Sequence, residues 1–411
     1  MKTLLDGVVV LDLTRFFSGP QCTLLLAGMG AEVIKIDDPR SGDPTAFAPP
    51  FAGASGTSFV KQTEHDMGLA YLKRQRGKKS ITLDLKSKAG IEVFLELVET
   101  ADVVVDNFSS GVMARLGIDY ASLAKVNPSI VCCSLTGYGQ TGPDRDAKAY
   151  DLMVQAAVGL VGLSGTPEGP PAKAATAMSD AISGVFAATG IVSALFHRQK
   201  TGHGQAIDVS MADCLFSLIF DEPIDCYRQL GLQPRQGNRI MRFSPFNVYR
   251  TRDGWVAIGT ATAAEWLALL RAMGQSELPT SRPELLETSW RISNNGEVDA
   301  LIDAWLHDLT SAEVLNQLGQ TGVPCSLVRS IDDVLAWDQL RAREMIVPLT
   351  NPLSGATVQA GAPGFPIKFS HTPASYAVPA PIPGSHTDAI LAQRAGLTEA
   401  RIQQLRADGV I

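Results

Sequence analysis

Short apolar segments alternate with helix-forming segments through the first half of the chain. The segments that have the length and composition of buried strands are 8–13, 32–36, 80–84, 103–107 and 130–134. The segments between them that are predicted as helices include 20–30, 88–99 and 120–126. Strands that alternate with helices form parallel sheets, because each return to the same edge needs a crossover connection. The pattern therefore predicts an α/β fold with an open, doubly wound parallel sheet.

The turn after the first predicted strand lacks the glycine pattern of dinucleotide-binding sheets. Residues 14–20 read TRFFSGP where a GxGxxG motif would stand. Ligands of such sheets nevertheless bind at the carboxyl ends of the strands. We therefore expect a ligand at that edge, but not an ordinary dinucleotide.

The second half of the chain has a different organisation. A helix is predicted from about residue 211 to 230, and a polar and basic loop follows at 232–242. A hairpin with strands 246–250 and 255–259 then turns at Arg-Asp-Gly. Further helices and Pro-rich connections lead to a polar helix near the end of the chain.

The length of 411 residues is too great for one simple core and predicts two domains. The shift to polar and basic residues after the middle of the chain indicates where the domain boundaries lie. We predict a smaller α/β domain over 225–330. The large domain is predicted to comprise 1–224 and 331–411.

The composition is that of a globular protein with an acidic balance. Hydrophobic residues make up 45% and charged residues 19% of the chain, and the formal net charge is −7. The charges form no basic face, which argues against nucleic acid as a partner. No apolar segment reaches the ~18 residues that span a bilayer, and the cysteines and histidines show no metal-ligand spacing. We therefore expect a cytoplasmic protein without a metal or a membrane segment.

One carboxylate, Asp180, stands among small and apolar residues just before an apolar helix predicted over 185–196. A carboxylate that is desolvated there costs several kcal/mol unless it is paired or hydrogen-bonded. One interpretation is a helix N-cap, with Ser179 or Asp180 accepting the first backbone N–H groups. The other is a functional carboxylate. The residues alone favour the cap and leave the second interpretation open.

Sequence islands over the whole length resemble the family III CoA-transferases, a superfamily that includes the formyl-CoA and carnitine CoA-transferases and the α-methylacyl-CoA racemases. The islands in the first third are LLDGVVVLDLTRFFSGPQCTLLLAGMGAEVIKIDDPRSGD (4–43), RGKKSITLDLKSKAG (76–90), ADVVVDNFSSGVMARLGIDYASL (101–123) and SLTGYGQTGP (134–143). The remaining islands are AYD (149–151), TGHGQAIDVSMAD (201–213) and PGSHTDAIL (383–391). Seven islands in the right order make the resemblance specific.

The resemblance implies an architecture that the sequence pattern does not show. Family members are intertwined homodimers with an active site near the interface. Their large Rossmann-like domain is built from both ends of the chain. We expect the same homodimer here.

The resemblance also implies a covalent mechanism. The motif SDAISG (179–184) carries the aspartate that attacks the donor thioester in these enzymes, which makes Asp180 the nucleophile. Tyr150 and Asp151 match further active-site positions, although a helix start with a packed ring is the structural alternative. The racemases have a histidine where this chain has Tyr150. A tyrosine ordinarily has a pKa of about 10 and is a poor base at neutral pH, so this position favours a transferase.

The family's CoA-binding positions carry over to residues on several predicted loops. They are Arg15, Phe16, Phe17, Ser18, Leu83, Lys86, Asn107, Phe108, Arg115 and Lys148. Relatives place a phosphate-binding arginine where this chain has Asp38, so Arg40 is the expected substitute. The basic residues at 74–79 offer other phosphate partners. For each basic residue, the alternative is a solvated surface charge.

The segment 237–243 differs from the glycine run of the formyl-CoA transferases, so the sequence leaves a flexible lid in doubt. Its Arg239 and Arg242 either bind the carboxylate of a substrate or are solvated surface residues.

The leading hypothesis is transfer of CoA from an acyl-CoA, such as succinyl-CoA, to a small carboxylic or dicarboxylic acid. Mixed anhydride and aspartyl-CoA thioester intermediates would form on the way. No cofactor is expected beyond the CoA of the substrates. The alternatives are an intramolecular CoA-transfer isomerase or acyl-CoA racemase, and a non-catalytic acyl-CoA-binding protein, which would have no need of Asp180.

Overall fold

The computed structural model describes residues 2–411 and divides the chain into two compact units. The large unit comprises Met1–Val158, Ala174–Glu222 and Asp338–Ile411. The small unit comprises Gly159–Lys173 and Pro223–Trp337. The segment 159–173 was predicted in the large domain, and the structure corrects this. It belongs to the small unit because the Gly165 and Thr166 carbonyls accept hydrogen bonds from Gly237 and Arg235.

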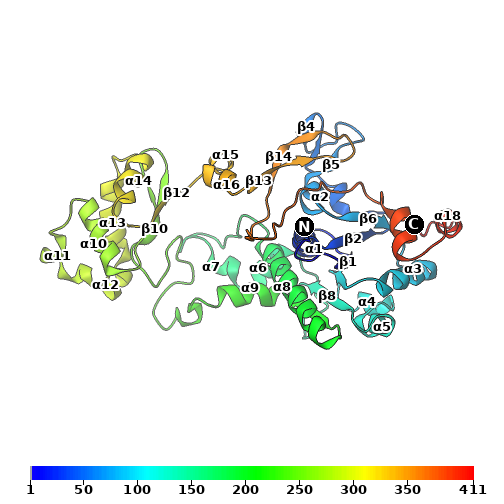
Figure 1. Ribbon diagram of the computed structural model, residues 1–411. Coiled ribbons are helices and arrows are strands. Elements are labelled where there is room, and N and C mark those ends of the chain that lie inside the picture. The colour runs from blue at the N-terminus through cyan, green and yellow to red at the C-terminus, as the bar shows by residue number, and fades with distance from the viewer. Residues whose placement is uncertain (1) are drawn as a thin grey trace. The chain divides into compact units, whose positions relative to one another are not determined.

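A six-stranded parallel sheet is the centre of the large unit, as the strand–helix alternation predicted (Figure 1). In spatial order its strands are β6 (Lys79–Thr82), β2 (Glu32–Asp37), β1 (Val9–Asp12), β7 (Val103–Asp106), β8 (Val131–Thr136) and β9 (Ala206–Ser210). Every neighbouring pair is parallel. The central strands β1 and β7 are buried along their whole length, because helices and loops cover both faces.

Helices of the large unit connect these strands and cover the sheet. They are α1 (Ser18–Gly28), α2 (Leu69–Arg74), α3 (Lys88–Glu99), α4 (Val112–Arg115), α5 (Tyr120–Val126), α6 (Asp151–Ala157), α8 (Met178–Thr201), α9 (Met211–Ile219), α16 (Asp338–Ala342), α17 (Thr387–Arg394) and α18 (Glu399–Ala407). The predicted helix over 211–230 ends at Ile219, because Pro223 lacks the N–H that would continue it. A 3₁₀ turn, Ile224–Cys226, follows.

The longest helix, α8, packs against α1, α6 and α9. It ends at Gly202, which adopts the left-handed conformation typical of helix C-termini. Among the described residues, α8 alone has the length and hydropathy of a membrane-spanning helix, so the expectation that no apolar segment reaches this length was wrong. Core helices of globular proteins also meet both criteria, and one face of α8 is buried in the large unit.

Both ends of the chain contribute to the large unit, as the resemblance implied. Helix α17 packs beside β6, where the His386 N–H donates to the Ser80 carbonyl at 2.9 Å. Thr387 accepts a hydrogen bond from the Thr82 N–H through its hydroxyl. These contacts tie the C-terminal segment to the edge strand of the sheet.

Two small sheets complete the large unit. One contains β4 (Gly56–Ser58), β3 (Phe51–Gly53) and β5 (Met67–Gly68), after the 3₁₀ turn Pro44–Ala46. The other is the hairpin of β13 (Ile346–Thr350) and β14 (Thr357–Pro363). They share an apolar cluster that includes Tyr71, Leu72 and Leu349.

The small unit has its own core around the fully buried Trp266. Its antiparallel sheet contains β10 (Phe246–Arg250), β11 (Trp255–Gly259) and β12 (Cys325–Leu327). Its helices are α7 (Leu160–Leu163), α10 (Ala263–Ala272), α11 (Leu278–Ser281), α12 (Thr288–Ser293), α13 (Asn295–Leu306), α14 (Ser311–Gly319) and α15 (Ile331–Ala336), with a 3₁₀ turn at Pro283–Leu286. The strands β10 and β11 have the bounds that the turn Arg252-Asp253-Gly254 predicted.

Candidate active site

The loop between β1 and α1 has a strained backbone. Phe16 has a φ of 67°, a left-handed conformation that non-glycine residues rarely adopt. Asn107, after β7, holds the loop: its Oδ1 accepts the Arg15 N–H at 2.9 Å, and its Nδ2 donates to the Arg15 carbonyl at 2.7 Å. The carboxyl ends of β1 and β7 therefore fix the loop that the sequence analysis singled out.

Asp180 lies in the first turn of α8 rather than at its cap. The helix begins at Met178, and no side chain caps its N-terminus, so the N-cap interpretation of Asp180 is wrong. The backbone N–H and the hydroxyl of Ser18, at the start of α1, approach the Asp180 carboxylate and lower its pKa. This contact requires α1 and α8 to cross closely. At the crossing, a Cβ on Gly184 would lie 2.7 Å from the Ser18 carbonyl oxygen.

Burial raises the pKa of Asp180 to about 6. The negative charge of Asp151 contributes to this increase, whereas the Arg74 guanidinium and the two Ser18 donors act in the opposite direction. Asp180 is therefore still ionised at neutral pH, and its carboxylate is less solvated than one on the surface. Such a group is a stronger nucleophile than a fully hydrated carboxylate.

Asp151 is buried, and its carboxylate accepts hydrogen bonds from Ser179, the residue before Asp180. Its Oδ1 accepts the Ser179 N–H at 2.9 Å and the Ser179 hydroxyl at 2.7 Å. Its Oδ2 accepts from Gln155 Nε2 at 2.7 Å. Because the carboxylate is occupied by these donors and does not line the cavity described below, Asp151 ties the start of α6 to the start of α8.

A cavity of about 370 Å³ in the large unit brings many of the expected residues together. The expected residues that line it are Phe16, Ser18, Asn107, Phe108, Lys148, Tyr150 and Asp180. The rings of Phe16 and Tyr150 meet edge to face, with centroids 6.3 Å apart. Arg145 and Met211 also line the cavity. The sequence analysis missed both, because a lone exposed arginine and a helix-start methionine carry no motif.

A second cavity, of about 210 Å³, adjoins the other side of Phe108. Three more of the expected CoA-binding residues line it: Arg15, Leu83 and Lys86. Its wall also contains Asp37, Asp38 and Asp84. Two cavities that share Phe108 are suited to an extended ligand with an apolar or aromatic part between two ends.

Acidic residues of this second cavity form ion pairs with Lys86, which lines it, and with Arg40, which does not. Arg40 Nη2 lies 2.8 Å from Asp84 Oδ2, and Lys86 Nζ lies 3.6 Å from Asp38 Oδ2. A phosphate would have to compete with these carboxylates for Arg40 and Lys86. Both cations are exposed, so such exchange needs little rearrangement.

Three expected CoA-binding residues line neither cavity: Arg40, described above, Arg115 and Phe17. Arg115 is exposed at the end of α4. Phe17 lies under the Arg74 guanidinium, with the Arg74 Cζ 3.9 Å from the ring centroid.

The basic residues at 74–79 are not a free phosphate-binding cluster. Lys78 is fully buried, and its Nζ lies 3.0 Å from Asp12 Oδ2. Arg76 donates to the Pro363 carbonyl, and Lys79 pairs with Glu32 at 2.6 Å. Only Arg74 faces the site, where it donates to the Phe16 carbonyl at 3.0 Å.

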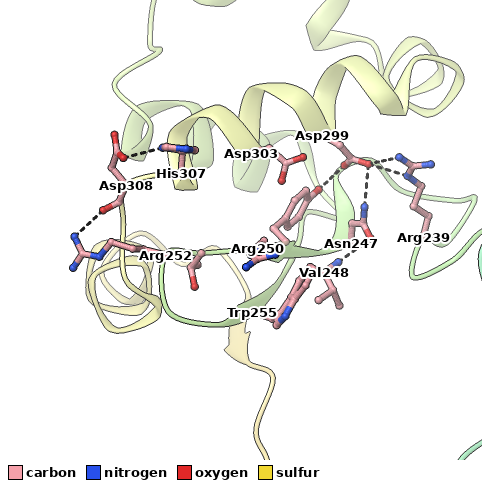
Figure 2. A pocket seen from close by; sticks show the side chains of 12 residues that line it. Arg239, Asn247, Val248, Arg250, Arg252, Trp255, Asp299, Asp303, His307 and Asp308 are labelled. Atoms are coloured by element: carbon pink, nitrogen blue, oxygen red, sulfur yellow. Dashed lines mark hydrogen bonds and ion pairs between the residues drawn. The ribbon is translucent and has the colours of Figure 1, made fainter.

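The small unit contains a cavity of about 700 Å³ beside the hairpin (Figure 2). Arg239, expected either to bind a substrate or to be solvated, lines this cavity and forms an ion pair, with its Nη2 2.7 Å from Asp299 Oδ2. The same carboxylate accepts from Asn247 Nδ2 at 3.0 Å and from the Tyr249 hydroxyl at 2.7 Å. Burial and Asp299 raise the pKa of Tyr249. The guanidinium of Arg242 lies near the Phe243 ring.

Among residues 2–411, no group of three or more His, Cys, Asp or Glu side chains is arranged to hold a metal ion.

The model of CoA-transferase family III matches residues 5–387. The chain belongs to this family. It is 36% identical to the acetyl-CoA:oxalate CoA-transferase of Acetobacter aceti, over 89% of each chain. It is 33% identical to the succinate–glutarate CoA-transferase of Agrobacterium fabrum, over 95% of this chain and 96% of the relative.

Further similarities point the same way. The succinyl-CoA:mesaconate CoA-transferase of Haloarcula marismortui is 34% identical over 94% of this chain and 95% of the relative. The crystal structure of a CaiB/BaiF family protein from Brucella suis superposes with a TM-score of 0.80 at 30% identity, over 96% of this chain and all of that one. The protein is thus an enzyme, a family III CoA-transferase, as the sequence islands predicted.

Proposed function

We propose that this CoA-transferase uses Asp180 as a covalent nucleophile. A carboxylate oxygen attacks the carbonyl carbon of the donor thioester, the C–S bond breaks, and CoA leaves as the thiolate. The thiolate then attacks the aspartyl carbonyl of the mixed anhydride, which releases the donor acid and leaves an aspartyl-CoA thioester. The acceptor carboxylate repeats both steps in reverse order and departs as the new acyl-CoA. The observation that carries this proposal is a half-buried, ionised Asp180 on the wall of a 370 Å³ cavity.

The surroundings of Asp180 suit this chemistry. The N-terminus of α8 carries partial positive charge that stabilises the ionised nucleophile. The Ser18 N–H and hydroxyl lower the pKa of the carboxylate, and the same donors are placed to stabilise an oxyanion that forms on the aspartyl carbonyl. The rings of Phe16 and Tyr150 form one wall of the cavity and reduce access of water to the anhydride.

We further propose that the second cavity and Phe108 bind CoA. Arg15 and Lys86 would meet its phosphates, and Asn107 and Phe108 its pantetheine or adenine. Lys148 is the cation of the first cavity that the family resemblance assigns to CoA. In this arrangement the thiol end of CoA reaches Asp180.

For the acids, we propose dicarboxylates. The relatives named above act on oxalate, glutarate and mesaconate. A second carboxylate needs a cation inside the reaction cavity, and Arg145 and Lys148 both line it. The donor proposed is succinyl-CoA, which the name of the Haloarcula relative contains.

The functional form is proposed to be a homodimer. One face of α8 exposes Val185, Phe186, Val192 and Phe196. Phe216 on α9 and Phe220, directly after it, are also exposed and stack with centroids 4.5 Å apart. Large apolar side chains gathered on neighbouring helices are typical of a covered interface. The occupant proposed is a second copy of this chain.

The test is CoA exchange with a panel of acids. The enzyme is incubated with succinyl-CoA and oxalate, malate, glutarate or mesaconate, and the acyl-CoA products are separated and weighed. We expect a new acyl-CoA from at least one dicarboxylate and at least 10³-fold less from Asp180→Asn. Asp213→Asn, an exposed change on α9, is the matched control and should keep the wild-type rate.

Two outcomes would contradict the proposal. Full transfer by Asp180→Asn would exclude this residue as nucleophile. No transfer to any acid, with exchange of an α-hydrogen for solvent deuterium, would favour the racemase alternative.

A further inference from the structure

Arg74, the last residue of α2, makes three interactions with the active-site loop and its carboxylate. Its Nη1 donates to the Phe16 carbonyl at 3.0 Å, and its guanidinium covers the Phe17 ring at 3.9 Å. Its charge also acts favourably on ionised Asp180. No sequence motif marked this residue apart from the basic cluster, whose other members are engaged elsewhere.

We propose that Arg74 is a positioning residue of the transfer reaction, which clamps residues 16–18 so that Ser18 presents its two donors to Asp180. The inference rests on the proposed role of Asp180 as nucleophile. Arg74 does not line the reaction cavity, so its action passes through the loop and the carboxylate rather than through contact with substrate.

The backbone of the loop needs such a clamp. The left-handed conformation of Phe16 is unfavourable by itself and persists only where neighbouring contacts fix it. Asn107 fixes the loop at Arg15, before the strained residue. Arg74 fixes it at the Phe16 carbonyl, the last group before Phe17 and Ser18. The strained residue is therefore held from both sides.

The stack on Phe17 completes the geometry. A guanidinium 3.9 Å above an aromatic ring combines cation–π attraction with planar packing, which an ammonium does not reproduce. With the Phe17 ring held under Arg74, the Phe16 ring meets Tyr150 at the cavity wall. The next residue, Ser18, begins α1 beneath Asp180.

The charges around Asp180 give Arg74 a second effect. Asp151 faces the carboxylate from α6 and disfavours its ionisation, whereas Arg74 from α2 favours it. Arg145, Lys148 and Tyr150 line the same cavity as Asp180. The negative charge of Asp43 in turn acts to raise the pKa of Arg74 and so favours its charged form. Loss of the guanidinium therefore both loosens the loop and removes a cation that opposes Asp151.

The test compares Arg74→Gln and Arg74→Lys with Lys73→Gln, which removes the same charge from the neighbouring position of α2. Steady-state kcat and KM are measured against pH in the exchange assay, with thermal unfolding as a check on folding. For Arg74→Gln we expect kcat to fall about 10- to 100-fold with little change in KM. We also expect the acidic limb of the rate profile to move to higher pH. Lys73→Gln should keep the wild-type limb.

Arg74→Lys separates the two effects and remains informative if Arg74→Gln does not fold. It keeps the charge but loses the planar stack, so kcat should fall while the acidic limb stays near its wild-type position. Wild-type kcat and pH profile in a folded Arg74→Gln, or in Arg74→Lys, would overturn the inference. If Asp180→Asn retained transfer, the proposed function would fail instead, so the two failures are distinguishable.

Discussion

Asp180 combines the two properties that a carboxylate nucleophile needs, partial burial and a retained charge. Burial and Asp151 raise its pKa to about 6, while Arg74 and Ser18 keep it ionised at neutral pH. The folded protein therefore binds a proton at Asp180 more tightly than the unfolded chain, whose aspartate has an ordinary pKa of about 3.9. As pH rises from about 4 through about 6, this residue makes a growing unfavourable contribution to the free energy of unfolding.

Asp180→Asn should consequently stabilise the enzyme at neutral pH while abolishing transfer. The amide has the shape of the carboxylate but no charge to desolvate. We expect the variant to melt a few degrees above wild type at pH 7 to 8, with the difference shrinking toward pH 4. Thermal unfolding across this range is the measurement. A difference that stays constant with pH, or a lower melting temperature at pH 8, would contradict the assignment of the pKa shift.

The sequence predicted which residues line the site better than it predicted which side chains pair with one another. Asp180, Tyr150 and Asn107 were found because each belongs to a local motif, and all three line the same cavity. The pairing of Arg239 with Asp299 was missed, because the two are 60 positions apart and no spacing rule joins them. Lys78 was expected near a phosphate because its ion-pair partner, Asp12 on β1, is also far away in the sequence.

Two helices, α1 and α8, set the distance between Ser18 and Asp180. Their crossing is possible because Gly184 has no side chain: a Cβ there would lie 2.7 Å from the Ser18 carbonyl oxygen and 3.0 Å from the Gln21 Cβ. A backbone atom cannot move aside as a side chain can. The motif SDAISG thus supplies both the nucleophile and the glycine that lets α1 approach it.

Gly184→Ala should therefore cost about 1–2 kcal/mol of stability, because the strain of overpacking exceeds the gain in helix propensity. It should also lower kcat, because the Ser18 donors are displaced. Gly190→Ala on the same helix is the matched control, since its Cβ would meet only Ile207 at 3.4 Å. That control should be neutral or stabilising by up to about 1 kcal/mol. Chemical denaturation and the exchange assay measure both effects, and equal behaviour of the two variants would contradict the crossing argument.

The bounds of helices and strands were predictable where turn or cap residues mark both ends of the element. The hairpin strands β10 and β11 have their predicted bounds, because a turn and alternating residues define them. The start of α8 was placed too late, and Asp180 was read as a cap, because small residues before an apolar run carry no boundary signal. The end of α9 was placed too far along the chain, although Pro223 was visible.

The whole molecule consists of two units with separate cores, one around the parallel sheet and one around Trp266. Composition placed the small domain at 225–330, whereas the small unit comprises Gly159–Lys173 and Pro223–Trp337. It did not predict that 159–173 belongs to the small unit, since that assignment depends on hydrogen bonds to residues 235 and 237. Contacts between distant segments are fixed by the tertiary structure, not by the local sequence.

The exposed apolar face of α8 leads to a prediction on assembly. Sedimentation equilibrium at micromolar concentration should give a dimer for wild type and a monomer for Phe196→Glu, because a charge on this face opposes its burial. Phe59→Glu, at an exposed ring directly after β4, is the control and should remain dimeric. A monomeric wild type, or a dimeric Phe196→Glu, would show that this face is not the interface.

The central claim is that Asp180 becomes covalently acylated, and direct trapping tests it. Wild type and Asp180→Asn are mixed briefly with the acyl-CoA donor that supports exchange, quenched with hydroxylamine and mapped by peptide mass spectrometry. The account predicts a hydroxamate at Asp180 in the wild type and none in the variant. An unmodified Asp180 in an enzyme that is transferring CoA, or a hydroxamate at another residue, would contradict it.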